Sequence, residues 1–152
     1  MFYFTREDFQ ELNEQMEKIC DKIKEIGQEI GKSCQEGADT FHDNFAYEDG
    51  ERQQYMWSNR LRELIRIRNN SRVITPDLNR DTVSMGRTIT IRNEMTGETK
   101  TFKVGSYMVL KDSKTISYNA PFVRPLIGAK IDETRESVIG GHKKIFKILK
   151  IE

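Results

Sequence analysis

A repeat of apolar residues near the N-terminus constrains this chain more than any other feature of its sequence. Seven apolar residues follow one another at alternating steps of three and four: Phe9, Leu12, Met16, Ile19, Ile23, Ile26 and Ile30. This spacing places their side chains on one stripe of an α-helix, and a repeat of seven residues is typical of coiled coils. Thr5 and Asp8 form a T-x-x-[DE] pattern, which predicts that the helix begins close to residue 5.

The partner for this stripe lies further along the same chain. Read backwards from residue 64, the same spacing recurs at Leu64, Leu61, Trp57, Gln54, Gly50 and Tyr47. The two stripes can face each other in an antiparallel pair if the chain reverses near residue 41. We therefore predict an all-α hairpin over residues 1–75. A coiled-coil dimerisation module is disfavoured, because the matching arm is present within the same chain.

Residues 37–47 are the predicted tip of this hairpin. Aromatic and acidic residues alternate there, and no apolar run is long enough to bury the segment. Carboxylates on an exposed loop, such as those of Asp39 and Asp43, can supply oxygen ligands to Mg²⁺. Acidic residues at a helix junction are also often simply solvated, so spacing alone leaves both interpretations open.

The period of the sequence changes from helical spacing to two beyond residue 81. Alternating residues and turn signals predict strands over 88–91, 100–104, 107–110, 136–139 and 143–151. Met95–Glu98 reads as the turn of one β-hairpin and Gly140-Gly141 as the turn of another. A short helix is favoured over 121–127, so the sequence predicts a second, mixed α+β domain over residues 76–152.

Charge is unevenly distributed along a chain whose net charge is only +1. Residues 1–50 carry thirteen acidic and five basic residues, whereas residues 75–152 carry nine acidic and fourteen basic ones. Such an uneven distribution favours a partner with separate acidic and basic surfaces, such as a complex that acts on nucleic acids. The second arm carries five arginines: Arg52, Arg60, Arg62, Arg66 and Arg68. They can contact nucleic-acid phosphates, or they can pair with acids of the first arm.

Several classes of protein are disfavoured by what the sequence contains. No apolar run is long enough for a signal peptide or a membrane span, which favours a cytoplasmic protein without a membrane partner. Cys20 and Cys34 lie about 21 Å apart at helical rise, so they cannot form a disulfide with each other. No phosphate-binding loop and no nucleophile–base constellation is present, so nothing indicates an enzyme.

Beyond these patterns, the chain resembles the Gre family of bacterial transcript-cleavage factors over nearly its whole length. The family's I-S-x-x-S-P phrase is similar to Ile116–Pro121, and its short helix ending in L-[IL]-G-[KA] is similar to the segment that ends in Leu126–Ala129. The final hairpin, which ends at Phe146–Ile151, matches as well. At the tip, the family's G-D-L-S-E-N-x-E-Y is similar to Asp39–Tyr47, where Asn44 and Tyr47 coincide with it.

The resemblance implies an antiparallel coiled-coil hairpin followed by an FKBP-like α+β domain in a monomer. It implies that the globular domain docks at the rim of the secondary channel of RNA polymerase, that the hairpin enters the channel, and that tip acids help to hold a catalytic Mg²⁺ shared with the polymerase. The polymerase then cleaves its own backtracked transcript, so the factor is not itself the nuclease.

Three groups of site residues follow, two from the resemblance and one from the arginines of the second arm. Asp43 takes the place of a Mg²⁺ ligand of the family, and Asp39 is its candidate partner. Polymerase-binding positions are Asn44, Tyr47, Asn119, Ala120, Pro121 and Phe122. Arg52 and Arg60 are candidates for contact with RNA, and the nascent RNA and the DNA of the elongation complex are met through the polymerase.

The tip departs from the family pattern in a way that keeps a second function open. Asp43 stands where the family has a longer glutamate, and Thr40 stands at the family's aspartate position, with Asp39 one residue away. A Gre-like protein that occupies the channel without stimulating cleavage, and thereby inhibits the polymerase, is therefore the alternative. A peptidyl-prolyl isomerase is disfavoured, because the C-terminal half has no tryptophan to floor an apolar pocket.

Overall fold

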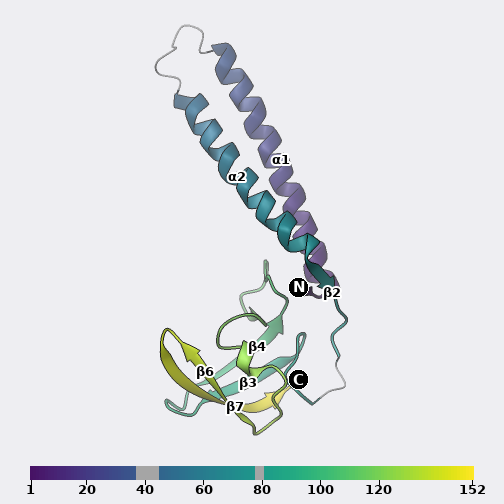
Figure 1. Cartoon of the computed structure of the whole chain (residues 1–152), viewed down its shortest axis with the longest axis vertical. Coiled ribbons are helices and arrows are strands. Elements are labelled where there is room, and N and C mark those ends of the chain that lie inside the picture. Colours follow the sequence, from purple (N-terminus) through teal and green to yellow (C-terminus); the bar gives the residue numbers. More distant parts are fainter. Residues whose placement is uncertain (37–44, 78–80) are drawn as a thin grey trace. The chain divides into compact units, whose positions relative to one another are not determined.

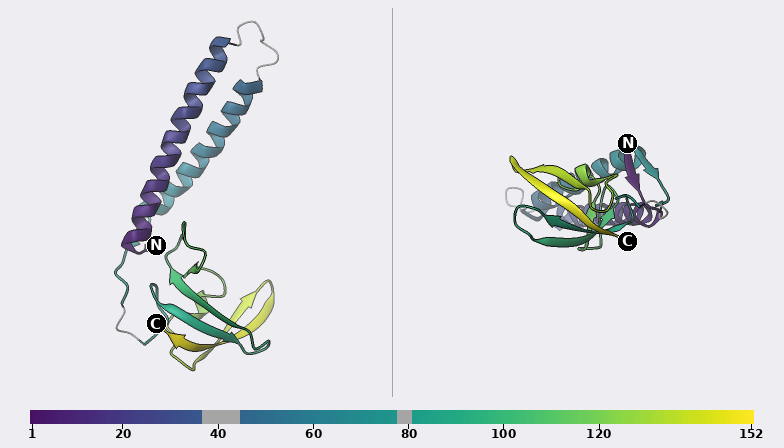
Figure 2. Two further views of the ribbon diagram at one scale, coloured as in Figure 1. Left: turned by 180° about the vertical axis from the view of Figure 1, so that it is seen from behind. Right: turned by 90° about the horizontal axis from the view of Figure 1, so that it is seen from below.

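Two long helices form the N-terminal half of the chain. The computed structural model describes residues 1–36, 45–77 and 81–152. Helix α1 spans Arg6–Glu36 and helix α2 spans Phe45–Asn69. Figures 1 and 2 show the two helices side by side and antiparallel. The predicted helical hairpin is therefore confirmed.

The predicted start of α1 is confirmed, but its acidic residue has a different partner from the one expected. The backbone N–H of Asp8 donates to Oγ1 of Thr5 at 3.2 Å, which satisfies one free donor of the first turn. Ser106 makes the remaining hydrogen bonds of the cap. Its Oγ accepts from the N–H of Thr5 at 2.9 Å and donates to the Asp8 carboxylate. A residue about a hundred positions away thus completes the cap.

The apolar stripe on α1 is buried as its spacing predicts. Four of its members, Leu12, Met16, Ile19 and Ile26, have less than a tenth of their surface exposed, as do Leu64 and Ile67 on α2. Near the other end of the hairpin the helices meet through glycines. A Cβ added to Gly50 would lie 2.7 Å from Cγ1 of Ile30, and one added to Gly27 would lie 3.5 Å from Nε2 of Gln54. The midpoint of Ile30 and Gly50 is position 40, one residue before the expected reversal.

A short parallel strand pair at the N-terminus was not predicted. Strand β1 (Phe2–Phe4) pairs with β2 (Ser71–Val73), which follows α2 directly. By its contacts the chain divides into a helical unit, Gln10–Asn70, and a second unit that joins Met1–Phe9 to Ser71–Glu152. The first nine residues thus belong with the β-sheet unit. The sequence concealed this role because an isolated three-residue strand leaves no periodicity.

The second unit is built on a curved five-stranded sheet with the order β5-β4-β3-β7-β6 (Figure 2). Its strands are β3 (Thr88–Asn93), β4 (Thr99–Gly105), β5 (Thr115–Ser117), β6 (Thr134–Ile139) and β7 (His142–Ile151). The β4–β5 pair is parallel and the other three pairs are antiparallel. Both predicted hairpins, β3–β4 and β6–β7, are present.

Two smaller predictions for this unit were wrong. Residues 107–110 form no strand, because Tyr107 is engaged by β1: its ring lies 4.2 Å from that of Phe2, and its N–H donates to the carbonyl of Tyr3. The predicted helix over 121–127 is only a single 3₁₀ turn, η2 (Arg124–Leu126). Pro125 sits inside that turn and has no N–H to extend an α-helix.

One face of the sheet carries the core. Alternate residues of β3, β4 and β7 point to it, and the segment that contains η2 covers them. The members with at most 1% of their surface exposed are Val83, Ile89, Ile91, Val104, Val123, Leu126, Ala129 and Ile148. The cover therefore lies next to residues 119–122, which hold four of the predicted site positions.

Candidate functional site

The predicted tip ligands fall in the segment between the two helices. Asp39, Asp43 and Asn44 lie within residues 37–44, outside the described part of the chain. Tyr47 is described: it stands in the first turn of α2 and is half-buried. Helix α1 ends and α2 begins at the same end of the hairpin, so the sequence with the two carboxylates joins the two helix ends there (Figure 1).

The arginines of the second arm lie along α2, and those with ion pairs described here are paired within that helix. Arg52 pairs with Asp49, and Arg66 pairs with Glu63 through Nη2 at 2.8 Å. The hydrogen bond from Arg52 holds the pKa of the Asp49 carboxyl below its usual value, and Arg66 does the same for Glu63. Arg52 and Arg60 are both exposed. Exposed ion pairs contribute little to stability, so the guanidinium group of Arg52 can exchange its carboxylate partner for a phosphate.

The loop after β5 has a defined conformation. Ser117 Oγ donates to the carbonyl of Tyr107 at 2.9 Å and accepts from the N–H of Asn119 at 3.1 Å. The N–H of Ala120 then donates to the carbonyl of Ser117 at 3.0 Å. This turn leaves Asn119 and Pro121 exposed and packs Ala120 against the core. Two of the four predicted binding positions in this loop are therefore available to a partner.

Phe122, the fourth position, is mainly a packing residue. Its ring lies 5.6 Å from that of Phe102 and 6.4 Å from that of Phe146, measured between centroids. Lys100 places its Nζ 5.0 Å from the centroid of the same ring. Phe122 is half-buried and belongs to the cover of the core, so a change at this position acts on stability first.

A cavity beside Phe122 was not predicted from the sequence. It measures about 300 Å³ and is lined in part by Lys100, Lys144 and Phe146. The alternation of inward-facing and outward-facing residues along β4 and β7 could have indicated it. Lys100 is two residues before the buried Phe102, and Lys144 is two residues before Phe146, so both lysines occupy core-facing positions.

The described residues also bear on the predicted metal and membrane properties. Residues 1–36, 45–77 and 81–152 contain no cluster of three or more His, Cys, Asp or Glu side chains that could hold a metal ion. Within the same residues, no helix is both long enough and apolar enough to cross a membrane.

The chain is similar to transcription elongation factors of one family. Residues 78–152 match the family model described as the C-terminal domain of the transcription elongation factors GreA/GreB. Transcription elongation factor GreA of Lachnoclostridium phytofermentans is 28% identical over 97% of this chain and 93% of its own length. GreA of Borreliella burgdorferi is 29% identical over 86% of this chain, but the chain spans only 14% of that longer protein.

A solved structure resembles the chain along its length. The GreA factor homolog 1 (Gfh1) of Thermus thermophilus aligns over 99% of this chain and 97% of its own, with a TM-score of 0.45 and 16% identity. The sequence matches cover the β-sheet unit and, in the Lachnoclostridium protein, almost the whole chain. Residues 78–152 of this chain thus match the Gre family of transcription elongation factors, and the chain as a whole is similar to GreA.

Proposed function

We propose that this protein binds RNA polymerase through its secondary channel, acts on paused or backtracked complexes, and stimulates the polymerase's own transcript cleavage. The observation that carries the proposal is the antiparallel pair α1–α2, whose adjacent ends are joined by a segment that contains two carboxylates. The similarity of the chain to GreA elongation factors, and the match of residues 78–152 to the GreA/GreB model, support the same partner.

The helices of the hairpin are long enough to reach into a channel. At 1.5 Å per residue, the 31 residues of α1 span about 46 Å and the 25 residues of α2 about 37 Å. The two helices pack along a buried stripe, so the pair is stiffer than a single helix. A stiff hairpin can carry its terminal carboxylates to a site that a compact domain cannot enter.

In this proposal the tip carboxylates have a binding role and no chemical role of their own. Asp43, with Asp39 beside it, would hold a Mg²⁺ ion together with the polymerase, and Mg²⁺ prefers such charged oxygen ligands. The bound ion would supply charge stabilisation at the phosphate and an activated water. In the same proposal the exposed guanidinium groups of Arg52 and Arg60 would meet RNA phosphates, and the exposed residues Asn119 and Pro121 would meet the polymerase rim.

The alternative function, inhibition without cleavage, is favoured by one observation in the sequence. Asp43 is one methylene shorter than the family's glutamate, which reduces its reach by about 1.5 Å. A ligand that falls short of the ion leaves a protein that fills the channel without completing the site. The two functions therefore differ in what happens when the side chain at position 43 changes.

A transcript-cleavage assay on stalled elongation complexes from the same source, at several Mg²⁺ concentrations, tests both functions. Wild-type protein should accelerate cleavage, and Asp43→Asn should reduce this acceleration most strongly at low Mg²⁺. Asp43→Glu should raise activity if short reach is the handicap. Asp21→Asn, an exposed acid on α1, is the matched control and should behave as wild type.

The alternative predicts a different set of results in the same assay. Wild-type protein would slow elongation without any cleavage, and Asp43→Asn would leave this slowing unchanged. That outcome would remove the metal-ligand role of Asp43 and leave channel occupation as the function. Absence of any effect on either reaction would contradict both functions.

A further inference from the structure

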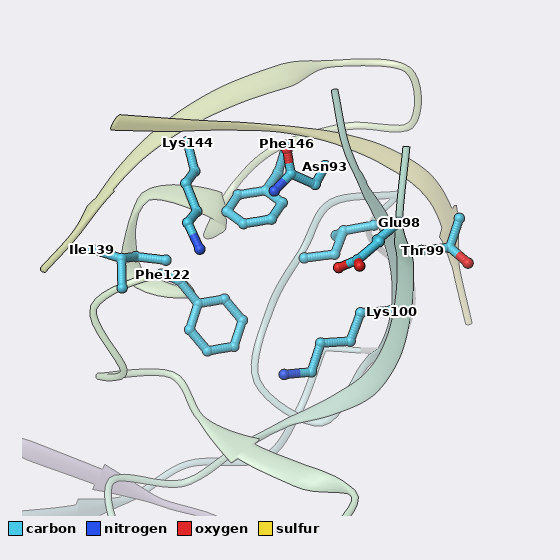
Figure 3. A pocket seen from close by; sticks show the side chains of 9 residues that line it. Asn93, Glu98, Thr99, Lys100, Phe122, Ile139, Lys144 and Phe146 are labelled. Carbon is cyan, nitrogen blue, oxygen red and sulfur yellow. The ribbon is translucent and has the colours of Figure 1, made fainter. Parts of the chain in front are cut away.

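The cavity beside Phe122 has the composition of a binding site. It opens on the core face of the sheet and combines two aromatic rings with charged and amide groups: Phe122, Phe146, Lys100, Lys144, Glu98 and Asn93. In Figure 3, Lys100 and Lys144 extend from different strands into the space beside the Phe122 ring. Its volume of about 300 Å³ is at the lower end of the range for small-molecule sites.

Strand register brings these residues together. Ile91 pairs with Lys100 across β3–β4, and Asn93 pairs with Phe146 across β3–β7. Ser137 of β6 pairs with Lys144. Directly paired residues point to the same face of a sheet, so all of these side chains share the face that carries the core. The cavity is therefore the part of the core face that the segment around η2 leaves open.

Both lysines stand on the core-facing side of their strands but reach solvent through the open cavity, since Lys100 is exposed and Lys144 is half-buried. The ion pairs at the two ends of β7 are made by Lys143 with Glu136 and by Lys150 with Glu152. Within the described part of the chain, Lys144 takes part in no ion pair, and the interaction found for Lys100 is with the Phe122 ring. Two ammonium groups thus face one cavity and are available for an anion.

Beside the two lysines, the cavity is lined by an amide and a carboxylate. Asn93 Oδ1 already accepts the N–H of Met95 at 2.9 Å, which leaves its NH₂ group as a donor. The Glu98 carboxylate lies two residues before Lys100 and can only accept hydrogen bonds when ionised. A ligand that uses all of these groups must therefore combine a negative charge for the lysines with neutral donors and acceptors.

We propose that this cavity binds a nucleotide. The base would stack against Phe122, since aromatic side chains are common platforms for bases. The phosphate would lie between the ammonium groups of Lys100 and Lys144. Asn93 and Glu98 would bind the edge of the base or the ribose hydroxyls, which offer both donors and acceptors. A simple anion would leave the rings and Glu98 unused, whereas a nucleotide engages the rings, the lysines and the polar groups together.

This inference goes beyond the proposed function and does not depend on the hairpin tip. It can be tested on the isolated full-length chain without RNA polymerase. Failure of the nucleotide site would leave the cleavage proposal intact, and failure of cleavage would leave the nucleotide site intact. The two results are therefore distinguishable.

The test is a titration of ¹⁵N-labelled full-length protein with AMP, followed through backbone amide resonances. Resonances of Asn93, Lys100 and Lys144 should shift and saturate. Lys100→Gln and Lys144→Gln should each weaken binding about tenfold, as expected for loss of one charge-assisted hydrogen bond to phosphate. Lys103→Gln and Lys143→Gln remove the same charge from the opposite face of the same strands, and they should leave the affinity within about twofold.

Further ligands separate the parts of the proposed site. Adenosine, which lacks the phosphate, and inorganic phosphate, which lacks the base, should each bind at least about tenfold more weakly than AMP. Phe122→Leu keeps the apolar cover but removes the ring, and it should also weaken AMP binding. A 5′-phosphorylated oligoadenylate that binds more tightly than AMP would identify an RNA strand as the source of the nucleotide, whereas equal or weaker binding would identify the free nucleotide.

Three outcomes would overturn the proposal. The first is no saturable shift at Asn93, Lys100 and Lys144 up to about 5 mM AMP. The second is inorganic phosphate binding as tightly as AMP, which would describe an anion site only. The third is an acidic peptide with a phenylalanine side chain displacing AMP at lower concentration than AMP itself requires, which would describe a peptide site. Well-dispersed spectra of each variant exclude unfolding as the cause.

Discussion

Gly50 of α2 and Ile30 of α1 are in such close contact that the glycine cannot gain even one carbon atom without displacement. A Cβ at Gly50 would stand 2.7 Å from Cγ1 and 3.4 Å from Cδ1 of Ile30. Both positions belong to the repeating stripes that predicted the hairpin. The notch at Gly50 holds the isoleucine, and this contact fixes the register of the two helices.

Gly50→Ala should therefore fail to stabilise the hairpin. Alanine normally stabilises a helix interior by about 1 kcal/mol over glycine, but overpacking against a stiff β-branched side chain costs about 1–3 kcal/mol. Gly31→Ala is the matched control, because its new methyl group would meet no atom within 4 Å. Thermal denaturation followed by circular dichroism should show a gain for Gly31→Ala and none for Gly50→Ala. Equal gains would mean that Ile30 does not occupy the notch.

The register also predicts which residues can be cross-linked. Ile30 lies against Gly50 and Gly27 near Gln54, so one turn further Ile23 should face Trp57. In a chain with Cys20 and Cys34 replaced by serine, a cysteine pair at Ile23 and Trp57 should oxidise within one molecule. A pair at Ile23 and Leu61, one turn out of register, should oxidise more slowly. Non-reducing electrophoresis distinguishes the products, and faster closure of the second pair would contradict the register.

Two serines in the β-sheet unit should respond in opposite ways to loss of the hydroxyl group. Ser106 accepts from the N–H of Thr5 and donates to Asp8, so Ser106→Ala leaves both groups without this partner and should cost about 1–3 kcal/mol. Ser84 has a buried Oγ for which the described residues offer no hydrogen-bond partner. Ser84→Ala should be neutral or stabilising. Urea denaturation of both variants measures this, and a larger loss for Ser84→Ala would contradict the assigned bonds.

Glu133 gives a prediction for acidic pH. Its carboxylate accepts the N–H of Lys130 at 2.8 Å and Nε of Arg135 at 3.0 Å, and these bonds lower its pKa below the usual 4.5. A lowered native pKa stabilises the fold at pH values above the unfolded pKa, and this contribution is lost as the pH falls through the native pKa. The stability difference between wild type and Glu133→Gln should therefore be largest at neutral pH and shrink below about pH 4.5. Urea denaturation at several pH values tests this, and a constant difference would exclude the carboxylate charge as its cause.

The helical hairpin could be predicted from the sequence because its signal is repeated. Each apolar residue of the repeat from Phe9 to Ile30 lies on the same stripe of the first helix, and the returning arm shows the same spacing. The β-hairpins around Gly97 and Gly140 were predictable because glycine is the residue that most readily adopts positive φ in a turn. Both glycines have positive φ in the structure. Periodicity and turn chemistry are local properties, and a single chain shows them directly.

What the sequence concealed depends on contacts between distant residues. Strand β1 is three residues long and exists because Phe2–Phe4 finds Ser71–Val73. Ser106 completes the cap of α1 from about a hundred residues away. Lys100 and Lys144 were visible as core-facing positions, but only the fold shows that the cover ends before them. The predicted tip roles of Asp39, Asp43 and Asn44 remain predictions.

The position of residue 43 within a complex with RNA polymerase tests most directly whether this protein works through the secondary channel. A photo-crosslinking amino acid can replace Asp43, with the same replacement at the exposed Asp21 of α1 as the control. On backtracked elongation complexes, position 43 should cross-link to the catalytic centre of the polymerase or to the 3′ end of the transcript, and position 21 should not. Cross-links from position 43 that are confined to the outer surface of the polymerase, or that match those from position 21, would contradict the proposed function.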